Sequence, residues 1–402
     1  MCEDLTHRGM KTMGPQRRIT LFLDGTWNTV NDNTNVWRLK ALSTNDTSQL
    51  CYYSAGVGTQ RGERIRGGMF GYGLDQEVVQ AYEWLTENYQ PEDKIFIFGF
   101  SRGAFTARSL AGLISKCGLL KAGSPISLTQ LYERYRKGGA VHSIRELHNQ
   151  AVGTHTQEDM WLIKYSQAVP LWFQGVWDTV GALGVPFGHI PVLSRSNYGY
   201  LETDLRINDT HAFHALAIDE HRKAFEPTLW KRTVSVGAQA YPARPLVQVE
   251  QRWFVGAHAD VGGGYANGLL AQQPLRWLMQ KAQMYGLTVK ASVDIDDDAN
   301  GGVIHDSFAE MAGGLYRACR LGRRYIRPIG TPTVTNDGHE TSTINESIDS
   351  SVFARWRADS KYRPPNLVEW SSRYRIDMSA IDPGHSVRAD NPATIIPDAV
   401  ST

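Results

Sequence analysis

The sequence predicts an α/β fold in which a mostly parallel sheet is covered by helices. Short apolar segments alternate with segments of helical periodicity, an alternation typical of parallel sheets. Several apolar segments also end directly in a polar residue or a glycine-rich turn, as strands do at the carboxyl edge of such a sheet. The strand-like segments are residues 19–23, 94–98, 171–177, 212–218 and 252–255.

The composition is that of a globular protein and excludes several other classes. Hydrophobic residues make up 42% of the 402 residues and charged residues 21%, so the chain can bury a core. The 42 Lys and Arg residues nearly balance the 41 Asp and Glu residues, leaving a formal charge of +1. A nucleic-acid partner is therefore not expected, because contacts with phosphates normally require a basic excess.

The cysteines and the apolar runs indicate the cellular compartment of the protein. Four cysteines lie far apart without a C-x-x-C pair, so neither a zinc site nor a disulfide framework is expected (Cys2, Cys51, Cys117, Cys319). No apolar run approaches the roughly 18 residues of a membrane span, and the N-terminus lacks the apolar stretch of a signal peptide. We expect a cytoplasmic protein as synthesised, with any export by a route that reads no such peptide.

The elements follow one another as a catalytic domain over 18–384, after a polar leader at 1–17. Helical spacing predicts helices over 36–42, 74–89 and 104–114, and one over 274–287 with Pro274 in its first turn. Residues 119–166 are polar and mostly helical, so they form an inserted cap beside the active site or, equally, a plain surface insertion. Residues 288–384 are expected to be a helical extension and 385–402 an extended or disordered tail.

A G-x-S-x-G pentapeptide places Ser101 between the strand at 94–98 and the helix at 104–114. This strand-turn-helix setting is the one that a nucleophilic serine requires. Glycines at 99 and 103 are explained by the sharp turn, because side chains there would collide with neighbouring strand and helix backbone. The sequence thus predicts Ser101 as a nucleophile. The alternative is a glycine-rich turn with an incidental serine.

His258 is the expected general base. It follows the apolar segment 252–255 and opens a glycine-rich loop, so its ring can reach a serine at the same sheet edge. Its place after the last strand agrees with the order serine, acid, histidine along a hydrolase sheet. His211, His214 and His221 are rivals that flank the preceding strand, where structural histidines are more common.

Two aspartates are candidates for the acid that orients the histidine. Asp219 follows the strand at 212–218, just before the histidine's strand, and the usual hydrolase order favours it. Asp178 follows the strand at 171–177, one strand earlier, and is retained because the acid only has to reach the far ring nitrogen. The candidate that does not serve is expected to hydrogen-bond loop amides.

An oxyanion hole is expected from backbone N–H groups at two places. One is Arg102, directly after the serine at the start of a helix. The other is the turn Asp24-Gly25-Thr26, where glycine permits close backbone approach and Asp24 can orient the loop. No cofactor is implied, and three scattered aspartates, Asp24, Asp178 and Asp260, lack the spacing of metal ligands.

A basic patch near residue 320 is the one feature that suggests a membrane. Five arginines interleave with aromatic and apolar residues there and can meet anionic headgroups in a peripheral contact (Arg317, Arg320, Arg323, Arg324, Arg327). A solvated helix face with ion pairs is the favoured alternative.

Six ordered motifs between residues 18 and 285 resemble the DUF2235 family of α/β-hydrolases, which includes phospholipase effectors delivered by type VI secretion. They are LFLDGTWN (21–28), GMFGYGL (68–74), IFIFGFSRGAFTAR (95–108), GVWDTVGALG (175–184), ALAIDEHR (215–222) and WFVGAHADVGGGY (253–265). The resemblance implies an α/β-hydrolase fold. It also implies a triad of Ser101, an aspartate at 178 or 219, and His258, with phospholipid esters as substrates in the effector branch.

The expected activity is therefore hydrolysis of carboxylic esters, lipids or phospholipids first, through an acyl-enzyme on Ser101. Two alternatives remain at this point. One is a hydrolase of small soluble esters, and the other is a binding module on a hydrolase fold with an inactive site.

Overall fold

The computed structural model describes residues 16–25, 32–56, 72–150, 153–181, 209–235, 244–296, 298–336 and 338–396. Thr26, most of the Gly-rich stretch at 56–73 and the leader at 1–15 lie outside them.

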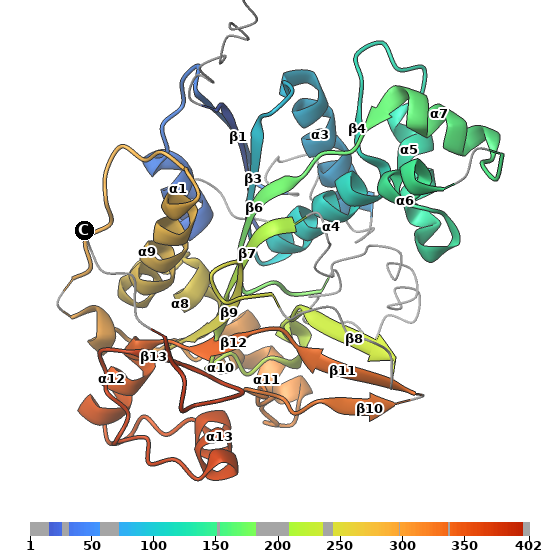
Figure 1. Ribbon diagram of the computed structural model, residues 1–402. Coiled ribbons are helices and arrows are strands. Elements are labelled where there is room, and N and C mark those ends of the chain that lie inside the picture. The colour runs from blue at the N-terminus through green and yellow to red at the C-terminus, as the bar shows by residue number, and fades with distance from the viewer. Residues whose placement is uncertain are drawn as a thin grey trace, which may run out of the picture.

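The described strands form a large central sheet in the order β14-β13-β12-β9-β7-β6-β3-β1-β2 (Figure 1). The strands from β2 to β12 run parallel, whereas β13 and β14 are antiparallel at one edge. This mostly parallel sheet flanked by helices confirms the predicted fold class. The bounds are β1 Arg18–Leu23, β2 Gln49–Ser54, β3 Lys94–Phe100, β6 Leu171–Trp177, β7 Asp209–Ala217, β9 Val249–Phe254, β12 Glu346–Ile348, β13 Ser386–Arg388 and β14 Ile395–Ile396.

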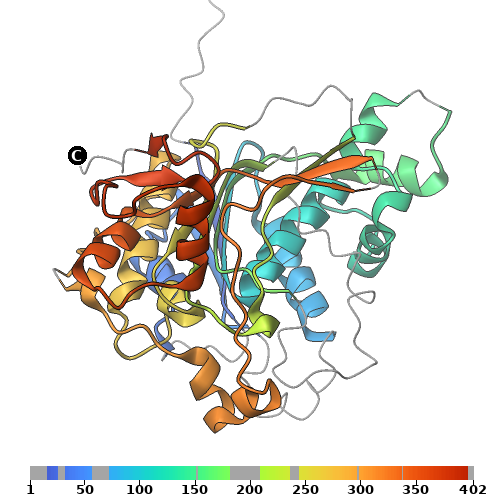
Figure 2. The ribbon, with the colours of Figure 1, turned by 90° about the horizontal axis from the view of Figure 1, so that it is seen from below.

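Helices cover both faces of the sheet, and the side chains of β3 show how each face is buried. Ile95 and Ile97 point to the face covered by α3 (Tyr72–Asn88) and α4 (Arg102–Cys117). Phe96 and Phe98 point to the face covered by α1 (Asn35–Leu42) and α9 (Leu269–Met284). Burial on both faces explains why the strand reads as a continuous apolar run. Figure 2 shows the strands enclosed between these two helical layers.

The register brings the carboxyl ends of the central strands to one level. Gly99 of β3 pairs with Leu23 of β1 and with Val176 of β6, and β7 and β9 end together at Ala217 and Phe254. Residues that directly follow these strands therefore gather at one edge of the sheet, where open α/β sheets bind their ligands.

Helix α9 begins earlier than predicted. The expected start at Pro274 is wrong, because the helix begins at Leu269 and contains Pro274 in its second turn. A proline there removes only one intrahelical hydrogen bond. Its carbonyl still accepts from the indole N–H of Trp177, at 3.3 Å.

The inserted segment lies at the amino ends of the strands. Helix α4 runs from the carboxyl edge, at Arg102, back to Cys117, and the insertion starts there and ends just before β6 (Figure 2). This position is that of a surface insertion rather than a cap over Ser101, because α4 separates the two. Its elements are β4 Leu119–Leu120, α5 Leu128–Arg136, η2 Gly138–Ala140, α6 Ile144–Asn149, α7 Gln157–Tyr165 and β5 Ser166–Gln167.

The C-terminal segment is not the helical extension that the sequence suggested. Strand β12 joins the central sheet, while β10 (Val334–Asn336) and β11 (His339–Thr343) form a second sheet with β8 (Lys231–Ser235). The central sheet continues beyond residue 384 through β13 and β14. The remaining elements are α8 His258–Gly262, α10 Ser307–Glu310, η6 Met311–Gly314, α11 Leu315–Cys319, α12 Ser350–Ala358, α13 Pro365–Tyr374 and the short turns η4 Lys223–Phe225 and η5 Ala299–Gly301.

The polar character of β12 hid it from a periodicity search. Glu346 and Ser347 are buried, and each has a specific partner in β9. Glu346 accepts the indole N–H of Trp253 at 2.7 Å, and the Ser347 hydroxyl donates to Glu250 at 2.7 Å. Such a strand is buried through satisfied polar groups instead of apolar ones.

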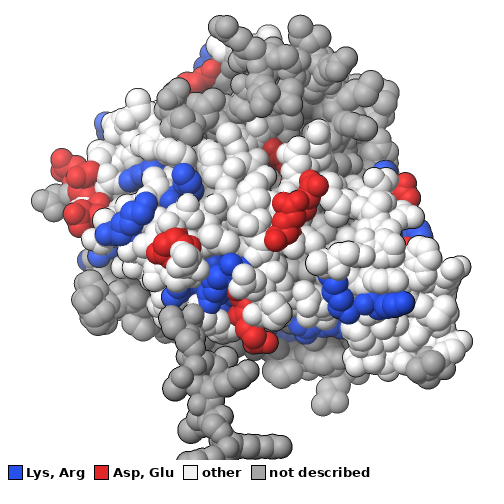
Figure 3. All heavy atoms as spheres, turned by 90° about the horizontal axis from the view of Figure 1, so that it is seen from above, with Lys and Arg blue, Asp and Glu red and all other residues white. Residues whose placement is uncertain are grey.

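Two surface properties bear on partners. Within the described residues, no helix has the length and apolar character to cross a membrane. On the face shown in Figure 3, basic and acidic side chains are interspersed, as a nearly balanced charge composition leads us to expect.

Candidate active site

Ser101 occupies a sharp turn between β3 and α4. Its backbone has φ +58° and ψ −121°, a conformation that residues with a side chain rarely adopt, so the turn is strained. A Cβ atom added to Gly99 would lie 2.5 Å from the carbonyl oxygen of Gly103, and one added to Gly103 would overlap that of Leu23. The turn therefore requires both glycines. The Ser101 N–H donates to Trp177 O at 3.1 Å, which ties the turn to β6.

His258 lies against Ser101. Its Nε2 is 2.8 Å from Ser101 Oγ, and the ring is buried between Phe100 and Phe225, with ring centroids 4.7 and 4.9 Å away. Burial lowers the pKa of His258, although the hydrogen bond to Asp178 opposes this shift. The imidazole is consequently neutral near neutral pH and can accept a proton.

Asp178 is the carboxylate that reaches the other ring nitrogen. Its Oδ2 lies 2.5 Å from His258 Nδ1, so the two residues and Ser101 form one continuous chain of hydrogen bonds. The carboxylate also accepts from Arg327, at 2.7 Å on Oδ1 and 3.0 Å on Oδ2, and from Ala217 N–H at 3.1 Å. Burial alone would raise the pKa of Asp178, but Arg327 and His258 outweigh it and hold that pKa well below its usual range.

Asp219, the acid that strand order favoured, does not contact His258. Its Oδ2 accepts Gly256 N–H at 2.7 Å and the Tyr362 hydroxyl at 3.1 Å, and its own N–H donates to Gly256 O. It thus holds the turn between β9 and α8. Burial raises its pKa to about 6. The preference is corrected because β6, which precedes Asp178, lies directly beside the nucleophile's strand β3, and β7 does not.

Each of the three rival histidines makes a structural contact. His211 Nδ1 is 2.9 Å from Trp172 O, and its ring stacks on Tyr285. His214 Nε2 accepts Thr179 N–H at 3.0 Å, and burial lowers its pKa to about 3. His221 Nδ1 lies 3.1 Å from a backbone carbonyl of the C-terminal segment.

Two buried charged residues at the site escaped sequence analysis. Arg327, fully buried against Asp178, was grouped with the surface arginines, since nothing in its local sequence distinguishes it from them. Glu220 is also fully buried. It accepts hydrogen bonds from the backbone N–H of His258 at 3.3 Å, the Ser307 hydroxyl at 2.9 Å and the Arg222 guanidinium at 2.7 Å. Its place directly after Asp219, in the motif ALAIDEHR, was the available signal.

The two oxyanion candidates differ in where their backbone N–H groups lie. The backbone N–H of Arg102 begins α4, at its positive dipole end. The side chain of Arg102 is half-buried, and loss of solvation lowers its pKa to about 10. Gly25 N–H instead donates to Asp24 Oδ1 at 2.8 Å, which removes it from the expected role. Asp24 itself is buried and also accepts the Thr34 hydroxyl, at 2.5 Å.

The aspartates considered as cation ligands lie in separate hydrogen-bond networks. Asp24 binds Thr34, Asp178 binds Arg327, and Asp260 binds His305 Nδ1 at 2.7 Å. In the described part of the chain, no group of three or more His, Cys, Asp or Glu side chains is arranged to hold a metal ion.

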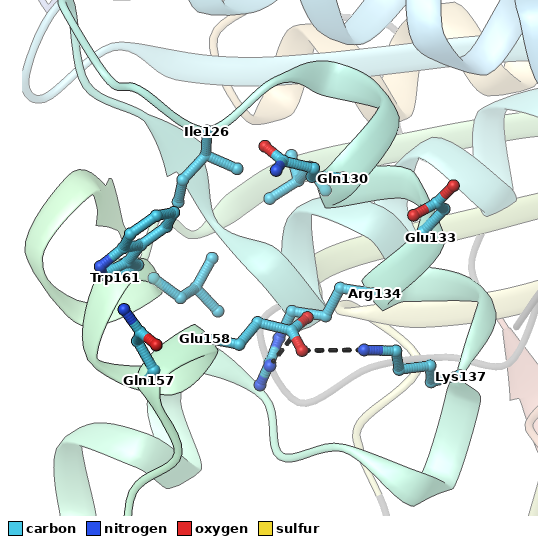
Figure 4. A pocket seen from close by; sticks show the side chains of 10 residues that line it. Ile126, Gln130, Glu133, Arg134, Lys137, Gln157, Glu158 and Trp161 are labelled. Carbon is cyan, nitrogen blue, oxygen red and sulfur yellow. Dashed lines mark hydrogen bonds and ion pairs between the residues drawn. The ribbon is translucent and has the colours of Figure 1, made fainter.

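A pocket of about 360 Å³ lies in the insertion, between α5 and α7 (Figure 4). The insertion lies at the other end of the sheet from Ser101. Trp161 and Ile126 form an apolar wall, and Glu158 pairs with Lys137 at 2.8 Å across its rim. The pocket contains no serine, cysteine or histidine that could attack a substrate, so it is not part of the catalytic arrangement.

Comparisons with known proteins cover part of the chain. A family model described as "T6SS, Phospholipase effector Tle1-like, catalytic domain" matches residues 17–281. Among curated proteins, the uncharacterized protein YEL023C of Saccharomyces cerevisiae is 30% identical over 230 residues, which are 52% of this chain and 32% of that protein. This chain therefore corresponds to about a third of that relative's length.

Two solved structures share a weaker similarity. The Tle1 effector bound to the VgrG spike of the type VI secretion system is 18% identical, with a TM-score of 0.35, over 66% of this chain and 56% of that one. An uncharacterized protein from Pseudomonas aeruginosa is 17% identical, with a TM-score of 0.40, over 77% of this chain and 51% of that one. Both matches span little more than half of the solved chains.

Proposed function

This chain belongs to the family of Tle1-like catalytic domains of type VI secretion phospholipase effectors, and we propose that it is a serine hydrolase of lipid esters, phospholipids first among them. The observation that carries the proposal is the chain of hydrogen bonds from Ser101 through His258 to Asp178. Nucleophile, base and orienting acid in this order are the arrangement of serine esterases on many folds.

In the proposed mechanism, Ser101 Oγ attacks the acyl carbon of the ester while His258 Nε2, 2.8 Å away, takes its proton. The tetrahedral oxyanion is bound by the Arg102 N–H at the start of α4. His258 then gives the proton to the leaving alcohol oxygen, and the acyl group remains on Ser101 as an ester. A water molecule, deprotonated by His258, hydrolyses this acyl-enzyme and restores the serine.

The role proposed for Asp178 follows from its contacts. Its carboxylate accepts from His258 Nδ1, which keeps the proton on that nitrogen and leaves Nε2 free to act as base. When His258 becomes charged, the nearby carboxylate stabilises it. Arg327 stays paired with both carboxylate oxygens, so Asp178 remains ionised throughout.

We include the C-terminal segment in the catalytic unit. Arg327 lies beyond residue 281, where the family match ends, yet it contacts Asp178 directly. A fragment limited to the matched residues would lose this partner and would leave a buried carboxylate without its counter-charge.

The test combines labelling with a substrate panel. A fluorophosphonate probe is expected to form an adduct on Ser101 in the wild type and none in Ser101→Ala. Hydrolysis of phospholipids and of short-chain soluble esters is then measured on both proteins. Faster turnover of the short-chain esters alone would favour a hydrolase of small esters. The absence of any adduct on Ser101 would favour an inactive binding module instead.

A further inference from the structure

The C-terminal segment packs beside His258 through a continuous set of contacts. The ring of Phe225 meets the His258 ring edge to face, and the Arg222 guanidinium lies 3.6 Å above Phe225. Arg222 also contacts the sulfur of Met311 in η6 at 3.7 Å. The Tyr316 hydroxyl of α11 accepts the backbone N–H of Ala224, which lies in η4 beside Arg222. Helix α11 therefore lies at the carboxyl edge of the sheet, next to the proposed catalytic residues.

The chain after α11 is held at this edge by a second anchor. Tyr325 N–H donates to His221 O at 2.9 Å, and His221 Nδ1 lies 3.1 Å from Tyr325 O. Arg324 pairs with Asp306 at 2.5 Å. Residues 315–323 thus project between two fixed points, and Figure 2 shows α10 and α11 standing out from the body at the end where the strands terminate.

These projecting residues expose leucines and arginines together. Leu321 is 83% exposed and Leu315 53%. Arg317, Arg320 and Arg323 are also exposed, and none of them has an ion-pair partner among the residues that the structure describes. We call these five residues the 315–323 surface.

The tip of this surface is held in an unfavourable backbone conformation. Leu321 has φ +49°, a value at which residues other than glycine are uncommon. Hydrogen bonds from Leu321 N–H to Ala318 O and from Gly322 N–H to Arg317 O hold the turn closed. A large apolar side chain is therefore presented to the solvent at a position where packing does not require it.

We propose that the 315–323 surface docks the protein on an anionic phospholipid bilayer, with its leucines inserted among the acyl chains and its arginines on the headgroups. The inference rests on the proposed function, because it explains how a lipid ester would reach Ser101 from a membrane. Each arginine near an anionic surface contributes about 1 kcal/mol, or roughly fivefold in partitioning. Since the chain carries a formal charge of only +1, this attraction has to be local.

The test measures cosedimentation of the full chain with vesicles of phosphatidylcholine, with and without phosphatidylserine. All proteins carry Ser101→Ala, so that the vesicles stay intact. The first variant has Arg317→Gln, Arg320→Gln and Arg323→Gln, and its binding to anionic vesicles is expected to fall by about 100-fold. The second has Leu315→Ser and Leu321→Ser, and its binding to the same vesicles is expected to fall by about 10-fold or more.

Matched controls come from the insertion at the opposite end of the sheet. Met160 is 53% exposed, as Leu315 is, and Arg145 is an exposed arginine, so Met160→Ser and Arg145→Gln remove comparable groups elsewhere. Both controls are expected to bind like the parent protein. High salt should weaken binding of the parent and of the controls.

The docking proposal would be overturned if the parent protein binds neither kind of vesicle, or if the two surface variants bind as tightly as the controls. The same variants with Ser101 restored separate this outcome from failure of the proposed function. Binding that depends on the surface, without release of fatty acid, would uphold docking and contradict the phospholipase. Hydrolysis of vesicle lipid at the same rate in the variants and the wild type would support the phospholipase and contradict docking through this surface. Turnover of a soluble short-chain ester is expected to be unchanged in both variants.

Discussion

Replacement of Asp178 by asparagine is expected to abolish catalysis by forcing the wrong tautomer on His258. Oδ1 of Asp178 accepts from Arg327 Nη1 and from Ala217 N–H, so the amide oxygen of an asparagine must take this position. The amide NH2 group then faces His258 Nδ1, which has to accept instead of donate. The ring proton moves to Nε2, where it points at Ser101 and cannot receive the hydroxyl proton.

The expected loss is large because the base is removed without disturbing its position. A wrong tautomer in such a site lowers kcat by about 10⁴-fold, which corresponds to roughly 5.5 kcal/mol of activation free energy. The assay is kcat/KM on a soluble chromogenic ester at neutral pH, with the melting temperature as a check of folding. Because the variant leaves the buried Arg327 without its counter-charge, its melting temperature is expected to fall, and kcat/KM is measured well below that temperature.

Asp219→Asn is the matched control, since it also removes one buried carboxylate from a residue that follows a strand. Its amide oxygen can still accept Gly256 N–H, and it has no contact with His258. We expect kcat/KM within about threefold of the wild type, as for a residue outside the reacting groups. A variant at 178 that keeps most of its activity, beside one at 219 that loses it, would refute the assignment of the acid.

Three further predictions concern the surroundings of the site. Arg327→Met should lower the free energy of unfolding by about 3–5 kcal/mol, because it leaves the buried Asp178 carboxylate without its counter-charge; urea unfolding equal to the wild type would contradict this. Gly103→Ala should destabilise the fold by about 3 kcal/mol or more, since its Cβ overlaps backbone of β1, whereas Gly139→Ala has open space and should melt like the wild type. Burial raises the pKa of Asp219 to about 6, so ionisation of this carboxyl lowers the stability of the wild type as the pH rises from 4 to 7. The melting temperature of Asp219→Asn should therefore rise relative to that of the wild type over this interval. A difference that stays constant with pH would argue against the shift.

Local patterns in the sequence were sufficient to predict the fold class and the position of Ser101 on the turn after a strand. Burial on both faces of β3 makes the strand continuously apolar, and the turn after it admits only glycine at two positions. The apolar run and the glycine spacing can both be read from residues that are neighbours along the chain, although the contacts that explain them come from other segments. For the same reason the place of His258 after β9 was visible, because the carboxyl ends of parallel strands meet at one edge.

The choice between the two aspartates could not be made from spacing. Both follow strands of the same sheet, and only the order of those strands in space decides which carboxylate meets His258 Nδ1. Strand β6 adjoins β3, so Asp178 ends beside the nucleophile, while Asp219 holds the turn before α8. The spatial order of strands depends on crossover connections, which periodicity does not encode.

The sequence by itself therefore determined the α/β architecture and the positions of Ser101 and His258 after their strands, because these depend on local sterics or on alternation of apolar residues, and its ordered motifs indicated the family. Only the tertiary structure decided the partner of His258, the burial of Arg327 and the position of the insertion at the far edge of the sheet. These features arise from contacts between segments up to 149 residues apart, as between Asp178 and Arg327, and charge pairing over such a separation leaves no periodic trace in the sequence.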